Sequence, residues 1–189
     1  MLRFLQLVCE GHNTEMQLLM QSQPGFAVSQ DLVSTVADVL SDVVPNVEVL
    51  DMFEGAELHT IIQVLEYLIE VIQGPCRENQ ALLATTPAIQ AAYTIIKWAP
   101  DVQGAHLLPR FTLKASAATF LYSLIEGRVA TEEDAVFSGL FKVIEASQVA
   151  ESIHRIYRNM KHTRTNEELC SQVQAEGFLL MSLARQMGQ

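Results

Sequence analysis

Apolar residues recur every three or four positions through nearly all of this chain, and this spacing limits the folds open to it. The clearest case is the stretch 58–73, where the apolar residues would form one stripe along a helix and Gly74 and Pro75 end the pattern. No stretch combines sustained alternation of apolar and polar residues with hairpin turn residues, as paired strands require. The chain is therefore predicted to be all-α.

Glycine, proline and capping residues predict where the helices begin and end. The first helix stops at Gly11, and Asn13 can cap the next one. Ser29, Thr131 and Asn166 are predicted caps further along, and residues 100–110 are expected to form the longest connection, a mobile surface loop. These boundaries give roughly eight or nine helices of about 10 to 20 residues. No clean repeat period appears, so a solenoid of helix pairs and a compact bundle both stay open.

The composition narrows the range of partners. A net charge of −10 over 189 residues opposes sequence-independent binding to nucleic acid or anionic lipid, because both need clustered Lys and Arg. The longest apolar stretch, 115–125, is interrupted by polar residues and is far shorter than the roughly 20 residues of a membrane helix. Three widely separated cysteines favour a reducing, cytosolic setting. We therefore expect a soluble chain with no nucleic-acid partner and no membrane insertion of its own.

Catalytic motifs are not found in the sequence. It has no Gly-x-Ser-x-Gly elbow, no Walker-type phosphate loop, no dinucleotide fingerprint and no His-Glu-x-x-His helix. A nucleophile built from Cys9 and His12 is conceivable, but Cys9 lies in an apolar run typical of a packed thiol. The chain is predicted not to be an enzyme. A hydrolase that uses Cys9 or a carboxylate pair is a lesser alternative, and it would need a deep pocket around perturbed groups.

Oxygen ligands for a cation would have to come from separate helices, since the chain lacks the twelve-residue calcium loop of alternating Asp or Asn. Glu70 and Gln73 are neighbours on adjacent turns of the predicted helix, so a carboxylate and an amide carbonyl can address one cation. Taken alone, both residues are more typical of a solvated surface. Glu10 ends the first helix, where a carboxylate opposes the negative end of the helix dipole and a bound cation would relieve that mismatch.

Two short blocks are too specific to be generic helix. The first reads Phe-Leu-Gln-Leu-Val-Cys-Glu-Gly-His-Asn over residues 4–13, and the second reads Glu-Val-Ile-Gln-Gly-Pro-Cys-Arg-Glu-Asn-Gln over residues 70–80. Both resemble the signature stretches of the associated homology domain shared by ryanodine receptors and inositol-trisphosphate receptors, the intracellular calcium-release channels. The segment 120–127 is similar to a further ryanodine receptor segment. Val71 stands where the family usually has Tyr, and residues 45–58 resemble neither receptor, so the branch stays open.

The resemblance implies an armadillo-like helical solenoid. It implies that residues 1–189 are a single domain of this type, excised from a much larger channel. Such a domain would lie on the cytoplasmic side of the endoplasmic or sarcoplasmic reticulum membrane, within a homotetramer. Its partners would be other domains of the parent channel, including the C-terminal domain.

The resemblance also implies a set of metal ligands. The glutamate of the first block falls on Glu10, and the glutamate and glutamine of the second fall on Glu70 and Gln73. In the family these positions contribute to the activating calcium site, which the C-terminal domain completes. The expected function is to supply these ligands and to couple calcium to pore gating, with weak calcium binding by the isolated fragment. The alternative is a metal-independent helical-repeat scaffold, which would present exposed apolar residues on a concave face.

Overall fold

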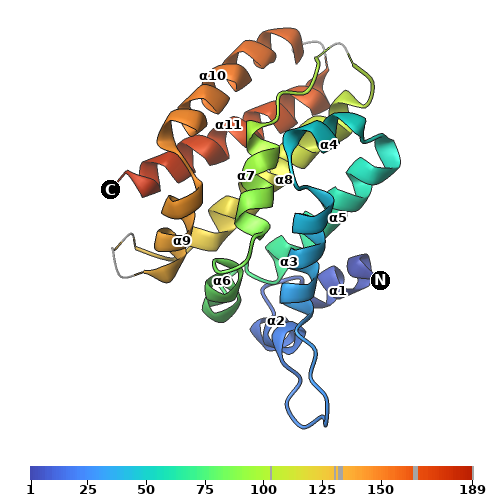
Figure 1. Cartoon of the computed structure of the whole chain (residues 1–189), viewed down its shortest axis with the longest axis vertical. Helices are drawn as coiled ribbons and strands as arrows, with labels where there is room; N and C mark the ends of the chain where they lie inside the picture. The colour runs from blue at the N-terminus through green and yellow to red at the C-terminus, as the bar shows by residue number, and fades with distance from the viewer. Residues whose placement is uncertain (103, 130, 132–133, 164–165, 189) are drawn as a thin grey trace.

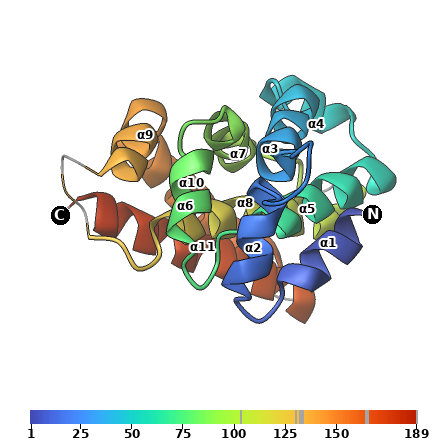
Figure 2. The same cartoon turned by 90° about the horizontal axis from the view of Figure 1, so that it is seen from below.

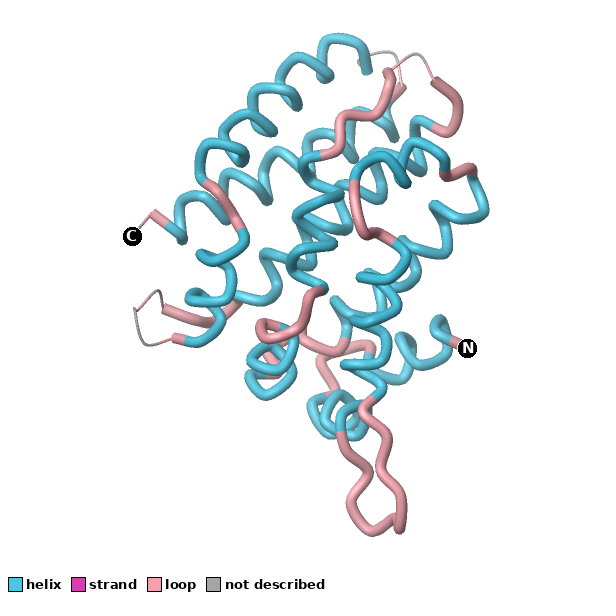
Figure 3. Tube along the Cα trace, viewed as in Figure 1, coloured by secondary structure: helices cyan, strands magenta, loops and turns pink. Residues whose placement is uncertain are grey.

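The computed structural model describes the chain from residue 1 to 188, apart from residues 103, 130, 132–133 and 164–165 and the side chains of 161 and 162. Within these residues the chain forms eleven helices and no strand (Figures 1 and 3). The helices are α1 (Leu2–Cys9), α2 (Thr14–Gln21), α3 (Leu32–Val43), α4 (Val47–Met52), α5 (Gly55–Glu70), α6 (Arg77–Leu83), α7 (Ala88–Lys97), α8 (Leu107–Ile125), α9 (Ala135–Val143), α10 (Ala146–Thr163) and α11 (Glu167–Met187). The all-α prediction is confirmed. The helices outnumber the predicted eight or nine because several are short, such as α4 with 6 residues and α6 with 7.

The long helices stack in chain order, as in a solenoid. Helix α1 packs on α5, α5 packs on α8, and α8 packs on α11, which α10 covers from outside. Figure 2 shows this succession running from the N-terminus to α11. Helix α8 is apolar around most of its circumference and is buried, because α5, α7 and α11 all pack on it. No helix in the described part of the chain is long and apolar enough to span a membrane.

Capping residues set most of the helix starts, and two predictions of this kind were correct. Asn13 caps α2 by accepting a hydrogen bond from the backbone N–H of Met16, and Asn166 caps α11 through Leu169. The predicted Ser29 cap is wrong. Asp31, two residues later, caps α3 by accepting from the N–H of Ser34, while the Ser29 hydroxyl bonds to Gln23 instead.

Two further boundaries differ from the prediction. Helix α8 begins at Leu107, so Pro109 lies in its first turn and not in a loop over 100–110. A proline fits there because the first N–H groups of a helix have no partner within it. Helix α9 is capped by Asp134 and not by Thr131, and the intervening Glu132 and Glu133 lie outside the described residues.

Three helices end in the same way, which the sequence analysis did not detect. Helices α1, α5 and α8 are each followed by a polar residue or turn and then a glycine with positive φ: Gly11 at 75°, Gly74 at 100° and Gly127 at 69°. The residues before these glycines are also alike, reading Val-Cys-Glu, Val-Ile-Gln or Leu-Ile-Glu. The intervals are unequal because the first contains four helices, α2 to α5, and the second contains three, α6 to α8. The unequal spacing hides the repeat from a search for a fixed period.

A buried ion pair joins the last helices to the middle of the fold. Lys114 Nζ lies 3.2 Å from Glu176 Oε1, and both side chains are almost completely buried. The same ammonium donates to the carbonyls of Ile95, Ile96 and Trp98 at the end of α7. Burial lowers the pKa of Lys114 and raises the pKa of Glu176. One side chain on α8 therefore fixes the position of both α7 and α11.

The loss of stability in the variant that lacks both partners should be smaller than the sum of the losses in the two single variants. Glu176→Leu is expected to destabilise the fold by about 3–5 kcal/mol, because Lys114 is then a buried charge without a counter-charge. Adding Lys114→Met should recover part of the loss, although the end of α7 then loses its donor. Urea denaturation of the two single variants and the double variant measures the coupling. Strictly additive losses would contradict the pairing.

Candidate functional site

The two sequence blocks meet in space at the turn between α1 and α2. The side chain of His12, which itself has a positive φ of 60°, covers Gly74 just beyond the end of α5. A Cβ on Gly74 would lie 2.6 Å from the His12 Cβ, closer than any real contact of this kind. Only glycine fits at this point, so the turn that follows Glu10 lies directly against the turn that follows α5.

A buried glutamine ties this junction together. The side chain of Gln17 on α2 is 1% exposed, and its Nε2 donates to the carbonyls of Glu70 at 2.6 Å and Gln73 at 2.8 Å. Asn79, equally buried, donates from Nδ2 to the carbonyls of Gln17 and Val71, both at 2.9 Å. The last carbonyls of a helix have no partner within it. Two side-chain amides therefore close the end of α5 and bind it to α2 and α6.

The next junction along the solenoid repeats the arrangement. Gln80 donates from Nε2 to the carbonyls of Ser123 at 2.8 Å and Glu126 at 3.1 Å, at the end of α8. Gln17 and Gln80 are each the sixth residue after a positive-φ glycine. The junctions differ in one respect, because Gln80 Oε1 accepts a hydrogen bond from Arg128 at 2.9 Å, whereas Gln17 Oε1 is buried with no hydrogen-bond partner.

The structure brings the predicted ligand residues to the first junction. Glu10 is exposed at the end of α1, and Glu70 and Gln73 are partly buried on and just after the last turn of α5. Burial raises the pKa of Glu70, and the negative charge of Glu10 raises it further, while His12 and Arg3 lower it. The two carboxylates are therefore close enough to repel each other. That repulsion is what a bound cation would relieve.

The carboxylates do not by themselves form a complete metal site. Among the described residues, no group of three or more His, Cys, Asp and Glu side chains is placed to hold a metal ion. Other acidic and amide side chains on α5 are occupied: Glu66 lies 3.8 Å from Arg3, and Gln63 donates to Gln6 at 2.7 Å. Any cation bound by Glu10 and Glu70 would need further oxygens from Gln73, water or another domain.

Cys9 lies beside this site but has the wrong chemistry for a nucleophile. It is fully buried, and burial together with the charge of Glu70 raises the pKa of its thiol to about 11. The thiol is therefore protonated at neutral pH, and the thiolate is the reactive form. This finding opposes a Cys9 hydrolase.

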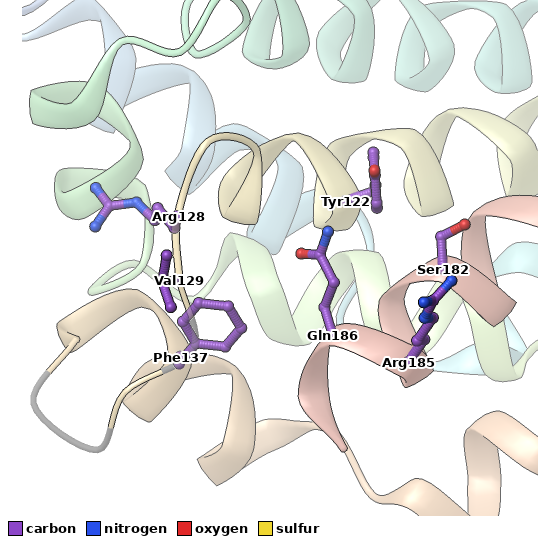
Figure 4. Close-up of a pocket in the computed structure, with 7 residues that line it drawn as sticks. All are labelled: Tyr122, Arg128, Val129, Phe137, Ser182, Arg185 and Gln186. Carbon is purple, nitrogen blue, oxygen red and sulfur yellow. The ribbon is translucent and has the colours of Figure 1, made fainter. Parts of the chain in front are cut away.

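A separate pocket of about 340 Å³ lies between α8, α9 and α11, and none of the predicted ligand residues lines it. Figure 4 shows Arg128 pointing away from the group formed by Ser182, Arg185 and Gln186. The Arg128 guanidinium is already paired with Asp134 at 2.8 Å. It is thus not free to bind an anion in this pocket.

Comparison with known proteins identifies the family of this chain. The sequence model of the "RyR and IP3R Homology associated" family matches residues 1–96, which is half of the chain and includes both blocks. The chain belongs to this family. It is also 31% identical over 136 residues to the inositol 1,4,5-trisphosphate receptor itr-1 of Caenorhabditis elegans, a match that covers 67% of this chain and 5% of the receptor. The predicted family is thereby confirmed.

The family match includes both sequence blocks that form the first junction, and it ends at residue 96, inside α7. It contains Glu10, Glu70 and Gln73, as well as Gln17 and Asn79, which the sequence analysis missed. The signal that could have found Gln17 was the glutamine at the sixth position after a turn glycine, which Gln80 repeats. This RyR and IP3R homology associated chain spans only about 5% of the length of the curated receptor that it matches.

The raised pKa of Glu70 predicts a pH dependence of stability. Because the folded state holds this proton more tightly, protonated Glu70 adds stability that is fully present below the unfolded pKa and is lost as pH rises through the folded pKa. In calcium-free buffer, Glu70→Gln should therefore be more stable than the wild type near neutral pH, and the difference should shrink as the solution is acidified. Urea denaturation from about pH 4 to pH 8 measures it.

Glu66→Gln is the matched control on the same helix. Its carboxylate pairs with Arg3, so its removal should give no such gain at neutral pH. Equal gains in the two variants would show that burial and Glu10 are not the cause.

Proposed function

We propose that this chain is a cytosolic solenoid domain of an intracellular calcium-release channel, in which Glu10, Glu70 and Gln73 contribute ligands to the activating calcium site. The observation that carries the proposal is the meeting of the two blocks, where the charge of Glu10 raises the pKa of Glu70 at the end of α5. Membership of the family supports it. The parent channel would be a homotetramer in the endoplasmic or sarcoplasmic reticulum membrane, with this domain on its cytoplasmic side.

The ligand count favours an incomplete site. Two bidentate carboxylates and one amide carbonyl offer about five oxygens, whereas calcium takes six to eight. A second domain, which we take to be the C-terminal domain of the channel, would supply the remainder. Calcium would then bind the isolated domain weakly.

Incomplete coordination suits a sensor. Calcium that binds better when two domains are together favours the arrangement that joins them, and this differential affinity can shift a gating equilibrium. Ionised Glu10 and Glu70 repel each other without calcium, and this repulsion lowers the stability of the folded domain. A bound cation would remove the repulsion. The domain would thus couple calcium to the pore.

A calcium titration by calorimetry tests this function. The wild-type chain should bind calcium with a Kd on the order of 10⁻⁴–10⁻³ M, in preference to magnesium, which requires a tighter octahedral shell. Glu10→Gln and Glu70→Gln should abolish measurable binding. Glu66→Gln, one turn away on α5, is the control and should bind as the wild type does.

Two results would contradict the assignment. One is equal weakening by Glu66→Gln and Glu70→Gln, which would indicate a diffuse charge effect. The other is the absence of calcium binding even when the C-terminal domain of the channel is attached.

A second candidate function, a metal-independent interaction scaffold, is favoured by one observation. Two apolar grooves of about 270 and 200 Å³ run between α10 and α11 and meet at Ile153. Phe178 and Met181 line the first and are more than half exposed. Such a surface suits the apolar face of an amphipathic helix.

A designed amphipathic helical peptide with a leucine stripe tests the scaffold function. It should bind the chain equally with and without calcium, and Phe178→Ser should weaken binding. Phe4→Ser, which removes an exposed phenylalanine from α1, is the control. Equal binding of a peptide with serines in place of the leucines would contradict this function.

A further inference from the structure

We infer that Gln17 is a positioning residue for the calcium site, setting the place of the Glu70–Gln73 turn relative to Glu10. The inference rests on the calcium-binding function proposed above. Gln17 would touch no metal ion. It would act through the backbone of the residues that carry the ligands.

Gln17 contacts two of the predicted ligand residues directly and is joined to the third through its own helix. Its amide donates to the backbone carbonyls of Glu70 and Gln73, at 2.6 and 2.8 Å, so one NH₂ group holds both ligand residues at the end of α5. On the other side, Gln17 belongs to α2, whose cap Asn13 lies three residues after Glu10. The turn between Glu10 and Asn13 is fixed in turn by the packing of His12 on Gly74. The positions of both carboxylates, Glu10 and Glu70, therefore depend on one buried side chain.

The hydrogen bonds from Gln17 are strong enough to hold the Glu70–Gln73 turn in place. Both acceptors belong to a helix end, where carbonyls lack partners and carry the negative end of the dipole. Gln17 is 1% exposed, so water does not compete for its amide group. Its Oε1 has no partner of its own, so the orientation of the amide depends on the two carbonyls alone.

The second junction shows that the clamp and the site are separable. Gln80 makes the same pair of bonds at the end of α8. There the residues that correspond to Glu10, Glu70 and Gln73 are Gln73, Ser123 and Glu126, a set with one carboxylate. Gln80 is thus a clamp of the same chemistry without the paired carboxylates, and it provides a matched control within the chain.

The effect on calcium follows from the geometry that the ion requires. Calcium–oxygen distances lie between about 2.3 and 2.6 Å, so a carboxylate that moves by about 1 Å ceases to be a ligand. Residues that orient metal ligands typically contribute 10- to 100-fold to metal affinity. Gln17→Met keeps the length of the side chain but removes its donors. It should weaken calcium binding at least tenfold.

The experiment compares Gln17→Met with Gln80→Met in the full 189-residue chain. Calcium affinity is measured by calorimetry, stability by urea denaturation, and the hydration of bound Tb³⁺ by its luminescence decay in H₂O and D₂O. Both variants should lose stability, because each leaves carbonyls without donors. Only Gln17→Met should weaken calcium binding and increase the number of waters on Tb³⁺. If Gln17→Met does not fold, Gln17→Asn replaces it, because it keeps a donor on a shorter side chain. Gln17→Asn should also weaken calcium binding and increase the number of waters on Tb³⁺, but by less.

The outcomes separate the two proposals. Wild-type calcium affinity and Tb³⁺ hydration in folded Gln17→Met or Gln17→Asn would overturn the positioning role while the calcium function stands. Equal weakening by Gln80→Met would also overturn it, since the effect would then follow from lost stability. A wild-type chain that binds no calcium even with the channel's C-terminal domain attached would overturn the calcium function and the positioning role together.

Discussion

Carbonyl groups at helix C-termini have no partner in their own helix, and the way they are satisfied decides how this solenoid is assembled. Three helices end against a buried donor from another helix: α5 against Gln17 and Asn79, α8 against Gln80, and α7 against Lys114. Each donor lies in a short helix or in the central α8, so satisfying a helix end also fixes a neighbouring element. Apolar packing brings these layers together, but it is not directional. The capping bonds select one register.

The features that were predictable from the sequence are those written in local patterns. The helix predicted from the stripe over 58–73 required only the helical period, although α5 ends at Glu70 and residues 71–75 form a turn. The caps Asn13 and Asn166 required only their place before an apolar run. The choice of Asp31 over Ser29 was not predictable in this way, because two adequate caps lie within one turn of each other and packing decides between them. The repeat of the glycine turns was visible in the letters but is interrupted by insertions of unequal length.

The candidate site also contains residues that were predicted from the sequence and residues that were not. Glu10, Glu70 and Gln73 could be named because specific blocks of sequence carry them, and the structure places them at one junction. Gln17, Asn79 and Lys114 were not named, because a polar residue on an amphipathic helix is usually exposed. Their burial depends on contacts made more than fifteen residues away along the chain, and Gln17 and Lys114 donate to carbonyls that no periodicity marks. The glutamine repeated after the turn glycines marks a position in the sequence, but the burial of that position becomes visible only when the helices are packed.

The chemical nature of each cap bears on where a cation would bind. At the end of α7 the donor is an ammonium group, whose positive charge opposes the negative end of that helix dipole. At the end of α5 the donors are neutral amides, so the dipole is left uncompensated, and Glu10 and Glu70 add two negative charges there. Had α5 been capped by a lysine as α7 is, the cap itself would have neutralised the junction. A neutral cap holds the backbone in place and leaves the charge for an ion to balance, which is the electrostatic condition that a cation sensor requires.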